Sequence, residues 1–209
     1  MIEVVTIARE YGSGGAELGR LVASKLGWEF LDRQLVDRVA RIAGLDPKTA
    51  ARLGEKAHRW WQWVLAGMSH GALYSYSVPD GLGVIDEGFV HGITMRLIQG
   101  AADSGKCVII GRGAQVFLHG RTDVFNVLAY APIEERIRRL RARHENRVDV
   151  QALIKQVDGQ RAKYVREYYR RDWLDKTLYD LCINTALGLE VAAELITTAI
   201  GIVKKEEPL

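Results

Sequence analysis

Cysteine is nearly absent from this 209-residue chain, which holds only Cys107 and Cys182. Both lie inside short apolar runs, and their separation is not that of a metal site. We interpret both as small buried hydrophobes, because two cysteines are too few to form a disulfide scaffold at this length. The scarcity of cysteine favours a reducing compartment, and we expect a cytoplasmic protein.

Long apolar stretches and an excess of one charge are also lacking. No run approaches the roughly 20 apolar residues that a membrane-spanning helix needs, and the N-terminus lacks the basic region and apolar core of a signal peptide. The net charge of +3 is too small to demand a nucleic-acid partner. We therefore expect a folded protein with neither a membrane nor a nucleic-acid partner, and a chain of this length suits one α/β domain.

Two kinds of catalytic site have no support in the sequence. No Gly-x-Ser-x-Gly motif is present, so nothing indicates a serine nucleophile. The histidines stand singly in different segments without ligand spacing, and we predict no metal site among them. They are His58, His70, His91, His119 and His144.

The feature that the chain does contain is a glycine-rich turn between a strand and a helix. An apolar β-branched run at residues 4–8 leads into Gly-Ser-Gly-Gly at 12–15, and a helical apolar pattern follows from Leu18 to Leu26. Glycines let successive N–H groups and the positive end of the helix point at phosphate oxygens. The order predicts a phosphate-binding unit, although the lysine that usually closes such a loop is missing. A dinucleotide site fits less well, because Glu17 stands where its third glycine belongs.

Further short apolar runs at 28–32, 107–110, 123–130 and 179–185 alternate with helical patterns. This alternation predicts an α/β fold with a doubly wound five-stranded parallel sheet flanked by helices. The run at 107–110 ends in Gly-Arg-Gly, which puts a cation at the carboxyl edge of the sheet, where ligands of such sheets bind.

Two groups of side chains have competing interpretations. Arginines at 136–147 occupy every side of the helix that Pro132 opens, so we interpret most of them as solvated and expect one or two at most to reach a ligand. The tryptophans at 60, 61 and 63 could stack on bases, but helical spacing favours a core or a dimer interface.

Together these segments resemble the cytidylate kinase-like family, a branch of the P-loop nucleoside monophosphate kinases. The resemblance covers nearly the whole chain and rests on residues 6–15, 30–33, 110–114, 131–147 and 172–185. It implies a single P-loop kinase-like domain over 1–209, with a helical acceptor-side region at about 33–104 and a lid-like region at about 145–172.

The resemblance also implies roles for individual residues. The donor ATP would bind at the loop, through Arg9, Gly12, Ser13, Gly14, Gly15 and Ala16. Mg²⁺ would be its cofactor, with no residue of the chain assigned as a metal ligand. The acceptor would bind through Asp32, Arg38, Arg112 and Asp180. Arg112 would also act in catalysis, together with Arg161 and Arg166 from the lid. Arginine suits phosphate because its planar fork gives bidentate contacts that stay charged.

The chain departs from the cytidylate kinase pattern at three places. Gly15 falls where the P-loop lysine would be, Ala16 and Glu17 fall where a magnesium-binding Ser or Thr is expected, and Gly113 replaces the aspartate of a Gly-Arg-Asp turn. A literal G-x-x-x-x-G pattern from Gly14 to Gly19 puts Gly19 inside the helix, so we interpret it as coincidental. Either Arg9 or a lid arginine would have to compensate for the lysine.

The expected function is therefore an ATP-dependent phosphotransferase acting on a nucleoside monophosphate such as CMP or dCMP. Two alternatives stay open: a nucleotide-binding or regulatory P-loop protein with weak or no kinase activity, and a kinase of another small-molecule acceptor. A homo-oligomer is compatible with the sequence.

Overall fold

The structure is a computed structural model that describes residues 1–32, 87–144 and 149–203. Arg38 and the tryptophans at 60, 61 and 63 lie outside the described residues, as do the expected helices between 33 and 86. The chain divides into two compact units, residues 1–30 with 106–209 and residues 31–105. In the second unit, helix α5 (Glu87–Ser104) lies within the helical acceptor-side region expected at about 33–104.

A five-stranded sheet in the order β2-β3-β1-β4-β5 organises the fold, as the doubly wound α/β prediction requires. The strands are β1 (Val4–Arg9), β2 (Glu29–Leu31), β3 (Cys107–Ile110), β4 (Val124–Tyr130) and β5 (Leu181–Asn184). The central strand β1 runs parallel to β3 and to β4, and β4 runs parallel to β5. The carboxyl ends of these strands therefore meet at one edge of the sheet, beyond Arg9.

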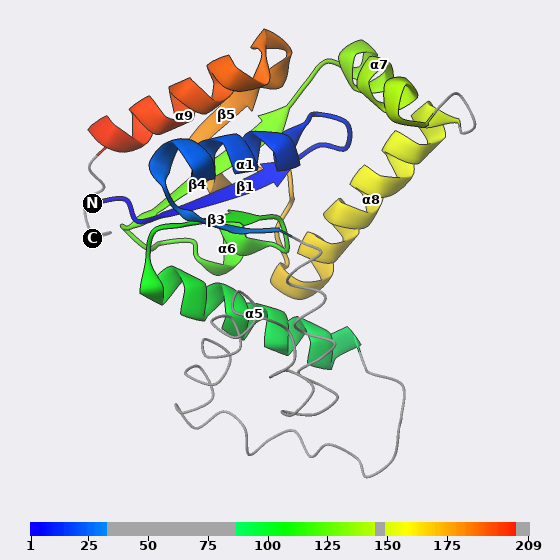
Figure 1. The fold of residues 1–209 in the computed structure, drawn as a ribbon. Coiled ribbons are helices and arrows are strands. Elements are labelled where there is room, and N and C mark those ends of the chain that lie inside the picture. The colour runs from blue at the N-terminus through cyan, green and yellow to red at the C-terminus, as the bar shows by residue number, and fades with distance from the viewer. Residues whose placement is uncertain (33–86, 145–148, 204–209) are drawn as a thin grey trace, which may run out of the picture. The chain divides into compact units, whose positions relative to one another are not determined.

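The helices of the first unit follow the strands in alternation (Figure 1). They are α1 (Gly15–Leu26), α6 (Ala114–Phe117), α7 (Ile133–His144), α8 (Val150–Tyr169) and α9 (Leu189–Ile202), with short 3-10 turns η2 (Lys176–Leu178) and η3 (Thr185–Leu187). Helices α1 and α9 pack side by side over one face of the sheet. Within the described ranges, no helix is both long enough and apolar enough to cross a bilayer.

The core lies between the sheet and the helix pair α1 and α9. Val5 and Ile7 of β1 pack there with Leu18 of α1 and Ile196 of α9, and all four are fully buried. Their neighbours on the other face of β1 are buried as well, which explains why this strand is apolar without alternation. The exception is Thr6, whose hydroxyl donates to the Asn126 side chain of β4 at 2.6 Å.

The two cysteines have different environments. Cys107 is buried, as expected, and burial raises the pKa of its thiol to about 12. The expectation that Cys182 is buried is wrong, because its side chain is exposed. It lies on the edge strand β5, where Ile183 points into the core and Cys182 points the other way.

Gly19 lies within α1, in agreement with the interpretation that the G-x-x-x-x-G pattern is coincidental. A Cβ atom there would lie 2.4 Å from Ile110 Cδ1 and 2.9 Å from the Phe30 ring. The glycine therefore lets α1 approach the sheet closely.

We expect Gly19→Ala to lower the free energy of unfolding by about 1–3 kcal/mol, because overpacking outweighs the helix propensity that alanine adds. Gly159→Ala in α8 is the control, since a Cβ there meets no atom within 4 Å; it should add up to about 1 kcal/mol. Urea denaturation measures both variants. Equal stability of the two would show that α1 does not need a glycine at its contact with β3.

Candidate functional site

A tight turn joins β1 to α1. The backbone of Gly12 (φ 83°) and of Gly14 (φ 80°) is in the left-handed region, which glycine adopts without strain. The N–H and the hydroxyl of Ser13 both donate to the Glu10 carbonyl, at 3.3 and 2.9 Å, and close the turn. The helix then begins at Gly15, with Gly14 as its N-cap and no side-chain cap.

A cavity of about 250 Å³ opens over this turn and the first turn of α1. Its lining residues are Arg9, Glu10, Tyr11, Gly12, Gly14, Gly15, Ala16, Glu17, Arg20, Leu140 and Arg161. The first N–H groups of a helix have no carbonyl of their own helix to bind, and the helix dipole is positive at this end. With three arginines around it in the described part of the chain, the cavity favours a bound anion.

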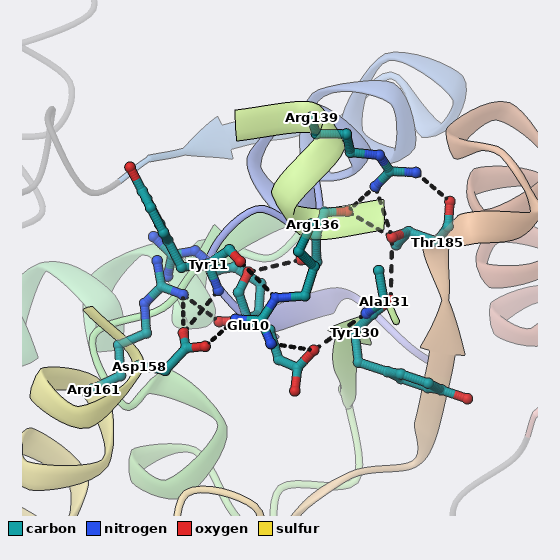
Figure 2. A network of polar contacts seen from close by, with 11 residues as sticks. Glu10, Tyr11, Tyr130, Ala131, Arg136, Arg139, Asp158, Arg161 and Thr185 are labelled. Atoms are coloured by element: carbon teal, nitrogen blue, oxygen red, sulfur yellow. Dashed lines mark hydrogen bonds and ion pairs between the residues drawn. The ribbon is translucent and has the colours of Figure 1, made fainter. Parts of the chain in front are cut away.

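A charged network from α7 and α8 holds the turn in place (Figure 2). One carboxylate oxygen of Asp158 accepts the Tyr11 N–H at 2.8 Å, and the other pairs with the Arg136 guanidinium. Arg136 donates to the Tyr11 carbonyl at 2.7 Å and pairs with the Glu10 carboxylate at 3.2 Å. The Arg136 side chain is only 8% exposed, so its charge depends on these two carboxylates.

Arg161 joins the network to the end of β1. Its guanidinium donates to the Arg9 carbonyl at 2.7 Å and to Asp158 at 3.1 Å, and it lies 5.7 Å from the centre of the Tyr11 ring. Because Arg161 also lines the cavity, α8 places a cation beside the turn.

A second set of contacts fixes the far side of the turn. Arg139 of α7 donates to the Ser13 carbonyl at 2.6 Å and to the Thr185 carbonyl at 2.8 Å, and the Thr185 hydroxyl lies 2.6 Å from the same Ser13 oxygen. Figure 2 shows the part of this bridge that joins Arg139 of α7 to Thr185, at the end of β5. The Ser13 carbonyl is thereby directed away from the cavity and Ser13 is fully buried.

The Gly-Arg-Gly turn after β3 contacts the C-terminal part of α8. Arg112 has a left-handed backbone (φ 62°), and its carbonyl accepts a hydrogen bond from the Tyr169 hydroxyl at 3.3 Å. Burial raises the pKa of Tyr164 to about 12, against an opposing effect of Arg112, and burial also raises the pKa of Tyr169. Both phenols therefore stay protonated at neutral pH and can donate hydrogen bonds.

The sequence model of the cytidylate kinase-like family matches residues 4–187, which include the turn, the charged network and the Gly-Arg-Gly segment. The chain belongs to the cytidylate kinase-like family. No curated protein sequence matches it.

Solved structures resemble this cytidylate kinase-like chain in fold. An uncharacterized protein from Eubacterium ventriosum has 19% identity and a TM-score of 0.69, over 97% of this chain and 100% of that one. Shikimate kinase from Bacteroides thetaiotaomicron has 14% identity and a TM-score of 0.54, over 97% and 100%. Shikimate kinase from Acinetobacter baumannii, in complex with shikimate, has 19% identity and a TM-score of 0.51, over 96% and 93%. These similarities establish the P-loop kinase fold.

The structure brings most of the expected donor-site residues of this family together. Arg9, Gly12, Gly14, Gly15 and Ala16 line one cavity with Arg161, whereas Ser13 is buried behind it. The expected role of these residues in binding phosphate stays a prediction.

Four other expected site residues in the described ranges do not line the cavity, and Arg112, in the Gly-Arg-Gly turn, is one of them. Arg166 is exposed on α8. Asp180 precedes β5 at the amino-terminal edge of the sheet, where its carboxylate accepts the Asn126 N–H at 2.7 Å. Asp32 directly follows β2 and is partly exposed. A bond to the backbone of β4 gives Asp180 a structural role whether or not it binds a ligand.

Two arginines of α7 contact the turn, and little in the sequence indicates their role. Arg138 and Arg141 are exposed, in line with the solvated surface expected for most of this helix, but Arg136 and Arg139 reach the turn. Arg136 precedes buried Leu140 by four residues and so lies on its side of the helix, a spacing that signals its burial but not its partners. Arg139 directly precedes Leu140 and has no such signal.

We expect Asp158→Ala to lower the free energy of unfolding by about 3–5 kcal/mol, because it leaves the buried Arg136 charge without its closest partner. Asp149→Ala on the same helix is the matched control. It removes only the N-cap of α8, which accepts from two backbone N–H groups, and should cost about 1 kcal/mol. Urea denaturation compares them, and equal losses would contradict the network's role in holding the turn.

Proposed function

We propose that this protein is an ATP-dependent phosphotransferase whose acceptor is CMP or dCMP. The observation that carries the proposal is the cavity at the amino-terminal end of α1, where a glycine turn, uncapped helix N–H groups and three arginines of the described chain converge. Triphosphate is the anion that this combination suits, because several N–H donors and cations can bind its oxygens together. The family match supports a phosphoryl donor at this end of the helix.

Phosphoryl transfer requires the protein to align two substrates and to place positive charge beside the phosphoryl group that is transferred. The N–H groups of the turn and of Gly15 and Ala16 hold the donor phosphates. Arg161, directed to the cavity by its bonds to the Arg9 carbonyl and Asp158, stabilises the charge that develops during transfer. No side-chain base is needed, since the oxygen of an acceptor phosphate is already anionic.

The fit of Mg²⁺ depends on the oxygen ligands that the cavity offers. Ala16 has no hydroxyl group, but the Glu17 carboxylate lines the cavity in the first turn of α1. Mg²⁺ accepts one or two carboxylates together with substrate phosphates, so Glu17 would hold it. When bound, Mg²⁺ supplies charge neutralisation between the donor phosphates.

Arg112 is the proposed acceptor clamp. Its turn lies at the carboxyl end of β3, and the turn's backbone is attached to α8 through the Tyr169 hydroxyl. A guanidinium here would bind an acceptor phosphate in bidentate fashion. Arg38, Asp32, Asp180 and Arg166 remain predictions for the acceptor and the lid.

A kinase of another small acceptor is the second candidate, and the Gly-Arg-Gly turn favours it. Gly113 stands where the related cytidylate kinases have aspartate, and a Cβ atom there would lie 2.3 Å from the Tyr169 ring. The tyrosine ring therefore occupies the space of the missing side chain. The missing aspartate removes a contact expected for a cytidylate acceptor, which favours a different small molecule. Shikimate, the ligand of one fold neighbour, therefore belongs in the test.

We expect Mg-ATP with CMP or dCMP to release ADP, measured against UMP, AMP, shikimate and no acceptor. Arg112→Ala should lower kcat/KM for the acceptor by about 10²–10³, because a charged phosphate contact is lost. The control is Arg141→Ala, which removes an exposed arginine of α7.

Each other outcome selects an alternative. ADP release with shikimate but no nucleotide would favour the second candidate. ATP binding without ADP release for any acceptor would contradict the phosphotransferase and leave a nucleotide-binding protein.

A further inference from the structure

The position of the P-loop lysine is occupied by Gly15, and the structure gives a steric reason. A Cβ atom on Gly15 would lie 2.5 Å from Arg9 Cβ and 2.9 Å from Arg9 Cγ. Such distances do not occur between real side chains, so no residue with a side chain fits at 15 while Arg9 keeps its place. The Arg9 side chain, from the last residue of β1, lies across the start of α1.

The other end of the same side chain meets a second glycine. A Cβ atom on Gly111 would lie 1.9 Å from Arg9 Nη1. Gly111 directly follows β3, and its N–H donates to the Ile7 carbonyl of β1 at 3.1 Å. The Arg9 side chain thus extends from the phosphate turn to the Gly-Arg-Gly turn, and a glycine makes room for it at each end.

We infer that Arg9 supplies the cation that the P-loop lysine supplies elsewhere, with Gly15 leaving room for the base of its side chain and Gly111 for its guanidinium. The inference rests on the proposed function, since it assigns a donor-phosphate contact. A lysine at 15 would approach the donor phosphates from the start of α1. Arg9 lines the same cavity from the adjacent strand end, and its planar fork, which lies beside Gly111, is suited to two phosphate oxygens.

The other arginines of the cavity have different partners in the described structure. Arg20 stacks over the Phe30 ring, with 5.4 Å between its Cζ atom and the ring centre. Arg161 is bonded to Asp158 and to the Arg9 carbonyl, so it reaches the cavity from α8 and not from the loop. Of the three, Arg9 is the one in contact with the lysine position itself.

Because residue 9 and a side chain at 15 exclude each other, the inference can be tested by moving the cation from position 9 to position 15. Isothermal titration calorimetry of the full chain with Mg-ATP measures binding without any acceptor. Arg9→Ala should weaken ATP binding about 10- to 100-fold, the range for a lost charge-assisted contact. The control Arg141→Ala should bind ATP as the wild type does.

The double variant is the decisive member of the set. Gly15→Lys alone should lower Tm, because its side chain collides with Arg9. Arg9→Gly combined with Gly15→Lys removes the Cβ atom of residue 9 that a side chain at 15 would meet. This double variant should recover the Tm of the single Arg9→Gly protein and bind ATP at least about tenfold more tightly than it.

The measurements distinguish a failure of this inference from a failure of the proposed function. Wild-type protein that binds no ATP would contradict the function itself. Wild-type binding with unchanged affinity in Arg9→Ala overturns the role of Arg9. A folded Arg9→Gly/Gly15→Lys variant that binds no better than Arg9→Gly overturns the exchange with lysine. An unchanged Tm in Gly15→Lys would refute the steric exclusion whatever the protein binds.

Discussion

The pairing of Asp158 with Arg136 is the interaction on which the site depends. A buried guanidinium from α7 and a carboxylate from α8 meet beside Tyr11, and both also bind the backbone of that residue. Both charges lie largely out of water. If either helix moved away from the turn, the charge on the other helix would stay buried without its partner, at a large cost in free energy. Glycines allow the backbone of the turn many conformations, but the contacts with α7 and α8 hold it in one of them.

That restraint explains how the cavity over the turn keeps its cations although the usual lysine of the loop is missing. Arg161 follows Asp158 by one helical turn, so the same attachment that positions the carboxylate also directs a cation to the Arg9 carbonyl. Arg139 and Thr185 fix the Ser13 carbonyl on the opposite side, away from the cavity. The cations around the proposed phosphate site therefore come from three separate elements, β1, α1 and α8, and not from the loop alone.

The sheet and the turn could be predicted from sequence because their signals are local. Apolar runs such as 107–110 and the glycines at 12–15 specify strand and turn by their own composition. The roles of Arg136 and Arg139 could not, because charge on a helix surface usually means solvent and their partners are Glu10 to Ser13, more than 100 residues away in the chain. The prediction that Cys182 is buried was wrong for the same reason, since its apolar neighbours in the sequence do not reveal that β5 is an edge strand.

The central claim is that the turn and the start of α1 bind the phosphates of a nucleoside triphosphate. Backbone amide spectra of ¹⁵N-glycine-labelled protein, titrated with Mg-ATP, test it directly. The account predicts large, saturable shifts at Gly12, Gly14 and Gly15, with Gly120 and Gly201, which neither line the cavity nor adjoin a lining residue, unmoved. Saturation with ATP while the glycines of the turn keep their positions would contradict it.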